Sequence, residues 1–112
     1  MILKIKNKDT LIIDEFKFRC AIGKNGIVKK KVEGDGCTPQ GTFSFGKLYW
    51  RNDRVKKLKT RLISKKIKKN NGWCNDPASN LYNKEVSDKN TFRKEKLFRS
   101  DDKYNYFIVI NY

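Results

Sequence analysis

Histidine is absent from this chain of 112 residues. Cys–His dyads, Ser–His–Asp triads and histidine-ligated metal sites all need its imidazole, so all three are excluded from the chain itself. Cysteine is scarce: only Cys20, Cys37 and Cys74 are present, and no two of them have the Cys-x-x-Cys spacing. An odd number of widely spaced cysteines argues against both a disulfide framework and a zinc site. We therefore expect no catalytic, cofactor-binding or metal-binding residue in this chain, and no cofactor.

Long apolar runs are absent as well. The N-terminus, which begins MILKIK at residues 1–6, has no apolar core of seven or more residues and no small-residue cleavage site. We therefore expect no signal peptide. No segment approaches the roughly 18 apolar residues of a transmembrane helix. The sequence therefore predicts no membrane span, and it leaves the localisation open.

Negative charge is also scarce, because 12 Asp and Glu stand against 27 Lys and Arg, a net charge of +15. High charge with low mean hydropathy favours disorder, whereas 12% aromatic residues and several β-prone runs favour a folded domain. Such a charge attracts polyanions non-specifically: nucleic acid, anionic lipid or anionic wall polymers. The alternative is that lysine is simply the default polar surface residue here. Both interpretations stay open.

Short β-prone runs, broken by glycine and asparagine, predict a mainly β fold with little helix. We expect a hairpin over residues 2–13, a turn at residues 23–26 and a strand of buried character, on both faces, at residues 106–110. Residues 70–83 are expected to form a polar loop, and residues 91–101 one or two helical turns. The remaining predicted strands lie at residues 16–20 (half-buried), 27–32, 42–45 and 48–50.

Four ordered segments resemble the catalytic domain of L,D-transpeptidases (YkuD-type). The second of them contains three glycines and a proline, which predict a tightly turned loop over residues 33–42. The segments are CAIGKNG at 20–26, GDGCTPQGTF at 34–43, GWCNDP with a following YN at 72–83, and EKLFR at 95–99 with Asp101 and Tyr104. The resemblance runs from about residue 18 to residue 112.

The resemblance implies an incomplete L,D-transpeptidase-type β-sandwich, with residues 1–112 as a single partial domain. The complete family transfers acyl groups between peptidoglycan stem peptides through a cysteine acyl-enzyme, and its members are found in the cell envelope or periplasm. Its nucleophile lies in a Ser-x-Gly-Cys segment with a histidine upstream, and neither is found in this chain. We therefore expect a truncated relative that is inactive alone, with stem peptides and the missing C-terminal half as partners.

Residues 54–69 hold nine Lys or Arg and no acid. Val55, Leu58, Leu62 and Ile67 recur at helical spacing, which predicts an amphipathic basic helix. The resemblance favours an extended connection instead, and we prefer that interpretation. An alternative function follows from the same segment: a basic binding module for nucleic acid or another anionic polymer, with aromatic rings stacking on bases.

Each candidate residue has a structural and a functional interpretation. A reactive thiolate at Cys37 is weighed against a turn filler, Cys20 is expected in the core, and Cys74 is expected to be structural. Arg99 is expected to pair with Asp101 or Asp102, and Lys94 stands where some relatives of the family have histidine. The acids that could either form turns and ion pairs or position a peptide amine or sugar are Asp35, Asp76, Glu95 and Asp101. The aromatic residues that could either stack on a ligand or fill the core are Tyr49, Trp50, Trp73 and Tyr82.

Overall fold

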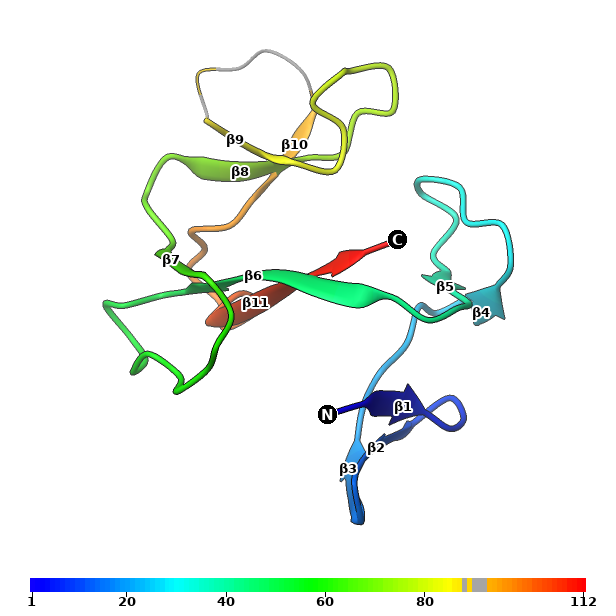
Figure 1. Cartoon of the computed structure of the whole chain (residues 1–112). Helices are drawn as coiled ribbons and strands as arrows, with labels where there is room; N and C mark the ends of the chain where they lie inside the picture. The colour runs from blue at the N-terminus through cyan, green and yellow to red at the C-terminus, as the bar shows by residue number, and fades with distance from the viewer. Residues whose placement is uncertain (88, 90–92) are drawn as a thin grey trace. The chain divides into compact units, whose positions relative to one another are not determined.

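The computed structural model describes residues 1–87, 89 and 93–112, and it is mainly β, with no helix among these residues. The chain divides into two compact units, unit 1 (Met1–Thr42) and unit 2 (Phe43–Tyr112). Figure 1 shows the strands in chain order. They are β1 (Leu3–Ile5), β2 (Thr10–Ile13), β3 (Phe16–Arg19), β4 (Ile27–Val28), β5 (Thr38–Pro39), β6 (Ser44–Trp50), β7 (Ser64–Lys66), β8 (Asn71–Cys74), β9 (Glu85–Ser87), β10 (Lys94–Lys96) and β11 (Tyr106–Asn111). The predicted mainly β class is confirmed.

Unit 1 begins with an antiparallel sheet in the order β1-β2-β3. The predicted hairpin is confirmed, with Leu3 opposite Ile13 and Ile5 opposite Leu11. The predicted half-burial of the next strand is wrong, because Phe16 and Phe18 of β3 are 59% and 50% exposed. A three-stranded sheet of short strands has too few side chains to cover both of its faces.

The second part of unit 1 is the glycine-rich loop of residues 33–42. The turn at 23–26 is confirmed by the bond from the Gly26 N–H to the Gly23 carbonyl (2.9 Å). The predicted strand 27–32 is too long, because β4 ends at Val28. β4 does not return along β3 either; it pairs in parallel with β5, which lies inside the loop itself.

The first sheet of unit 2 has the order β11-β6-β7, with β11 antiparallel and β7 parallel to the central strand β6. β6 is continuous where the sequence predicts two strands around Gly46. The register shifts here, because Leu48 lies opposite Ile108 but Phe45 opposite Ile110, so two residues of β6 face one of β11. This β-bulge keeps Gly46 inside the strand.

The second sheet of unit 2 has the order β10-β8-β9 and is antiparallel throughout. The predicted polar loop at 70–83 is wrong in its first part, because residues 71–74 form the central strand β8. The predicted helical turns at 91–101 are wrong for the described part, which contains β10, while residues 91 and 92 lie outside the described residues. The core of unit 2 is formed by Tyr49, Ile67 and Leu97.

The predicted amphipathic helix at residues 54–69 is wrong: a turn at residues 52–55 is followed by irregular chain up to residue 63, and residues 64–66 form β7. The start of this connection between β6 and β7 is fixed by two arginines. Arg51 is only 3% exposed, and its guanidinium forms two bonds to Asp53, one to the Arg99 carbonyl (2.6 Å), and stacks on the ring of Phe98 at 3.6 Å. Arg54 donates to the carbonyls of Ser100 and Asp101. These bonds give the early segment a defined path along residues 98–101.

β11 lies at an edge of its sheet, and its side chains alternate between exposed and partly buried. The prediction that this strand is buried on both faces is therefore wrong. Ile108 is 38% and Ile110 47% exposed, because in the described part of the chain β6 is the strand that pairs with β11. Among the described residues, the structure has no helix long and apolar enough to cross a bilayer.

Candidate functional site: an aromatic pocket between β8, β10 and β11

A pocket of about 220 Å³ opens in unit 2. Both sheets of the unit contribute to it: β8 and β10 from one, β11 from the other. It is lined by Trp73, Asn83, Glu95, Leu97, Tyr104, Phe107, Ile108, Val109, Ile110 and Tyr112. The wall is mostly apolar and aromatic, with a few polar groups, which is the usual composition of a small-ligand site.

Trp73 and Asn83 form the first polar pair of the pocket. The indole N–H of Trp73 donates to Oδ1 of Asn83 at 2.9 Å. Asn83 has a φ of 60°, in the left-handed region that asparagine tolerates better than most residues, and its backbone N–H donates to the Cys74 carbonyl (2.9 Å). The geometry thus explains Asn83 of the resembling Tyr82-Asn83 pair: the asparagine both turns the chain and orients the indole.

Glu95 supplies the charge of the pocket. It lies directly opposite Trp73 in the pairing of β10 with β8, and Lys103 Nζ donates to its Oε1 at 2.8 Å. Burial acts to raise the pKa of Glu95, but hydrogen bonds from Lys103 and from the hydroxyl of Tyr104 together hold that pKa below its usual value. The carboxylate is therefore ionised at neutral pH, next to aromatic rings.

Aromatic rings form much of the pocket lining. Phe107 contacts Trp73 edge-on, with ring centroids 5.1 Å apart, and Tyr104 at 5.4 Å. Burial, and then the bond to Glu95, raise the pKa of Tyr104, so its hydroxyl stays protonated and can donate. The arrangement can hold an apolar or sugar surface on its rings and accept a hydrogen bond from an ammonium or amide group at Glu95.

None of the three cysteines is among the residues that line this pocket. Cys74, on β8, is fully buried, which agrees with the structural role expected for it. Cys37 and Cys20 belong to unit 1 and are partly buried. Cys20 is therefore more exposed than the core position expected for it. Among the described residues, no three Asp, Glu or Cys side chains gather in a way that could hold a metal ion.

Asp35 organises the glycine-rich loop of unit 1. Its Oδ1 accepts from Lys31 Nζ (2.7 Å) and from the Cys37 N–H (2.8 Å), and its Oδ2 accepts from the Val32 N–H (2.8 Å). The bond from Lys31, followed by those from Val32 and Cys37, lowers the pKa of Asp35 to about 2. The carboxylate of Asp35 therefore holds the turn, in agreement with the structural one of the two interpretations given for this residue.

Close backbone contacts explain Gly23, which packs against the glycine-rich loop. A Cβ atom on Gly23 would lie 2.7 Å from the Cys37 carbonyl carbon, so a side chain cannot be placed there without moving the loop. The Gly23 N–H also donates to the Thr38 hydroxyl at 2.8 Å. The segments 20–26 and 34–43, which both take part in the family resemblance, thus contact each other directly.

The other acids of the resembling segments form turns and ion pairs. Asp76 accepts from the Ala78 N–H (3.0 Å). Arg99 pairs with Asp101 at 2.8 Å, as expected, and Asp101 also accepts from the Lys103 N–H. Of the four candidate acids, Glu95 alone lies in the pocket.

The aromatic candidates divide in the same way. Tyr49 and Trp50 are buried, in agreement with their core interpretation, whereas Trp73 lines the pocket. Tyr82 is partly buried next to Asn83. Lys94 pairs across the sheet with Cys74.

Glu85 is a polar centre that the sequence does not reveal. Its carboxylate accepts from the Tyr49 hydroxyl (3.0 Å), from Lys65 Nζ (2.9 and 3.0 Å) and from the Asn71 side-chain amide (3.0 Å). Burial, and then the bond to Glu85, raise the pKa of Tyr49 to about 12. Glu85 joins four strands, β6, β7, β8 and β9, and so fixes the two sheets of unit 2 to each other. Only its place in a β-prone run, Glu85-Val86-Ser87, could have pointed to it.

Comparisons of the chain with protein-family models, with curated proteins and with solved structures returned no match.

Proposed function

We propose that this chain is the scaffold part of an L,D-transpeptidase-type domain, one that binds peptidoglycan stem peptides without carrying the catalytic residues. The observation that supports this most is the pocket. Residues of two separate resembling segments, Trp73 and Asn83 from 72–83 and Glu95 and Tyr104 from 95–104, line the same cavity. The two segments meet because β10 pairs with β8, which places Glu95 opposite Trp73.

The polar groups of the pocket suit a stem peptide. An amine or amide N–H of the peptide would donate to the ionised Glu95, and a methyl or methylene group would rest on Trp73 and Phe107. In the complete family, a cysteine thiolate forms the acyl-enzyme and an amine of a second stem accepts the acyl group. This chain contributes binding and orientation to that reaction, and the thiolate and histidine are supplied from elsewhere.

β11 is the edge at which the rest of such a domain would join. It is an apolar edge strand, bound to β6 on one side. Additional strands pairing with it would cover Ile108 and Ile110 and would bring new residues next to the pocket, whose wall β11 forms. Strands that joined at this edge would therefore lie beside the pocket.

Co-sedimentation with purified peptidoglycan tests the proposal, in salt high enough to screen the net charge of +15. We expect Glu95→Gln to weaken binding, while the matched control Glu15→Gln, an exposed glutamate of unit 1, leaves it unchanged. Equal binding by both variants, or binding that disappears with salt, would contradict the proposal.

A turnover assay with a tetrapeptide-stem substrate tests the second part of the proposal, that this chain does not carry the catalytic residues. We expect no transpeptidase or carboxypeptidase activity from the chain alone. Turnover that is abolished by Cys37→Ala would show that Cys37 is the nucleophile and that the chain is an enzyme by itself.

A further inference from the structure

Seven cations of unit 2 are exposed within fourteen residues. We call residues 56–69 the basic segment; its exposed cations are Lys56, Lys57, Lys59, Arg61, Lys66, Lys68 and Lys69. The eighth, Lys65, differs, because it pairs with Glu85. The segment contains no acid, and no ion pair of these seven is found among the described residues. Their charge is therefore available to an anionic partner.

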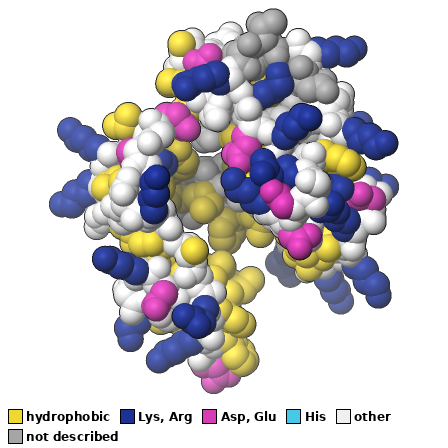
Figure 2. Space-filling model, turned by 180° about the vertical axis from the view of Figure 1, so that it is seen from behind, with side chains coloured by type: hydrophobic (Ala, Val, Ile, Leu, Met, Phe, Trp, Pro, Cys, Tyr) yellow, Lys and Arg dark blue, Asp and Glu magenta, His cyan; other side chains and the backbone are white. Residues whose placement is uncertain are grey.

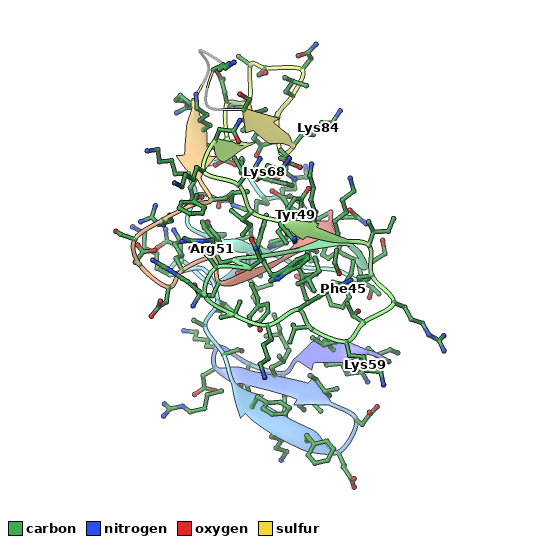
Figure 3. All side chains as sticks on the ribbon, turned by 90° about the vertical axis from the view of Figure 1, so that its left-hand side faces the viewer. Phe45, Tyr49, Arg51, Lys59, Lys68 and Lys84 are labelled. Carbon is green, nitrogen blue, oxygen red and sulfur yellow. The ribbon has the colours of Figure 1, made fainter. Side chains whose placement is uncertain are left out.

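The basic segment is held in place at its first residue and from its middle onward. The Tyr106 hydroxyl donates to the Lys56 carbonyl at 2.6 Å, and the Leu48 N–H donates to the Ile63 carbonyl at 2.9 Å. From Ser64 the chain pairs with β6 as β7. Figure 3 labels Lys59, on the connection between β6 and β7, and Lys68, after β7. Because the backbone is already ordered, a partner that binds here loses little free energy in fixing it.

Net charge alone does not distinguish this segment. Figure 2 shows Lys and Arg side chains over much of the visible face. Unit 1 also exposes apolar side chains beside lysines, Phe16 and Phe18 among them, but its cations are less dense along the chain. The basic segment combines its dense cations with exposed aliphatic side chains: Ile63 is 71% and Leu58 43% exposed. Such a combination suits a partner with both an anionic and an apolar part.

We propose that the basic segment binds the surface of an anionic phospholipid bilayer. Lipid phosphates would neutralise the lysines, while Leu58 and Ile63 would enter the boundary between headgroups and acyl chains. Nucleic acid fits less well, because proteins that bind single strands combine cations with aromatic rings for base stacking, and the basic segment contains no aromatic residue. This surface lies outside the residues that line the pocket, so the inference does not depend on the stem-peptide proposal.

Vesicle co-sedimentation tests the inference, with vesicles of phosphatidylcholine and about one-third phosphatidylglycerol. The charge variant is Lys57→Gln/Lys59→Gln/Arg61→Gln. Its control is Lys8→Gln/Lys84→Gln/Lys96→Gln, three exposed lysines outside the basic segment whose replacement changes the net charge by the same amount. We expect at least about a tenfold loss of binding for the first and little for the second, because each cation close to an anionic bilayer contributes about fivefold. Equal losses would show attraction by net charge alone and would overturn the proposal.

A second variant separates a bilayer from other polyanions. Ile63→Ser keeps every charge, and Ile63 is so exposed that its replacement leaves the fold intact, which a thermal melt checks. We expect weaker binding to the vesicles and unchanged binding to a single-stranded oligonucleotide. Unchanged vesicle binding by Ile63→Ser, or tighter binding of the oligonucleotide than of the vesicles, would show that the segment is a binder of nucleic acid or of polyanions in general.

Discussion

At the scale of single residues, the carboxylates of this chain act mainly by accepting hydrogen bonds. Asp35 accepts three, two of them from backbone N–H groups. An ionised acceptor is needed for all of them at full strength, and this is why the pKa of Asp35 falls to about 2. A proton on Asp35 would weaken the bonds that hold the loop.

The first prediction concerns the pH dependence of this loop. The pKa of Asp35 is lower in the folded state than its ordinary value of 3.8. Its contribution to stability is therefore complete above about pH 4, and it is lost as the pH falls through about 2. The amide proton shifts of Val32 and Cys37, followed by NMR, should titrate with a midpoint of about 2.

The control separates this loop from the rest of the chain. Asp35→Asn should remove the titration of both amides, whereas Asp101→Asn, which removes another acid with a pKa of about 2, should leave it unchanged. A midpoint near 3.8 in the parent protein would mean that Asp35 does not hold the loop.

Glu85 is the residue whose loss we expect to damage unit 2 most. Glu85→Ala removes the acceptor of the Tyr49 hydroxyl and of the Asn71 amide, and both donors are part of buried residues. Because unsatisfied buried donors are costly, we expect the free energy of unfolding to fall by about 2–4 kcal/mol. Urea unfolding measures this, with the exposed Glu15→Ala as control. A change below about 0.5 kcal/mol, typical of surface substitutions, would contradict the role given to Glu85.

At the scale of elements, the sequence predicts the existence of strands better than their partners. The hairpin of β1 and β2 follows from two short apolar runs around a polar turn, and the structure confirms it. The partner of β4 could not be predicted, because an Asn-Gly turn indicates a return of the chain along the preceding strand, whereas here β4 pairs with the loop that follows it.

β8 was missed for a related reason. Its sequence, Asn71-Gly72-Trp73-Cys74, has the composition of a turn, and only pairing with β9 and β10 on both sides makes it a strand. A Cβ on Gly72 would lie 3.1 Å from the Lys94 side chain, so the glycine allows a close approach of the neighbouring strand. Tertiary pairing here overrides local preference.

The prediction at this scale concerns the edge strand β11. Its exposed apolar side chains and free edge favour pairing with a second chain, and the high positive charge opposes it. Added salt screens that repulsion, so we expect the parent chain to self-associate as salt is raised. Ile110→Lys, which places a charge on the edge, should prevent this, and analytical ultracentrifugation at low and high salt measures it.

A matched variant tests whether the edge itself is responsible. Ile2→Lys changes an exposed isoleucine of unit 1 that lies outside the strands and adds the same charge. It should associate with salt as the parent chain does. If both variants behave alike, association depends on net charge rather than on β11.

At the scale of the whole molecule, the candidate site could be predicted in part. Glu95, Trp73 and Asn83 were marked out by the resembling segments, and the structure brings them together in one pocket. Phe107 and Val109, which complete its wall, could not be selected, because nothing in a sequence separates an apolar side chain that lines a pocket from one that fills a core. Glu85 was missed because its three donors are distant in sequence.

The proposed function requires that the pocket beside β11 binds a stem peptide and that the chemistry comes from residues outside this chain. The chain contains two tryptophans, which provide a probe and its internal control. The indole N–H of Trp73 bonds to Asn83 in the pocket wall, whereas Trp50 is buried on β6 and is not part of that wall.

The most direct test is an NMR titration of the chain with a disaccharide tetrapeptide of peptidoglycan, followed through the two indole N–H signals. We expect the Trp73 signal to shift in a saturable way, the Trp50 signal to stay in place, and the shift to weaken in Glu95→Gln. If neither signal moves at millimolar ligand, or if an unrelated peptide of the same charge shifts Trp73 equally, the pocket is not a stem-peptide site and the proposed function is wrong.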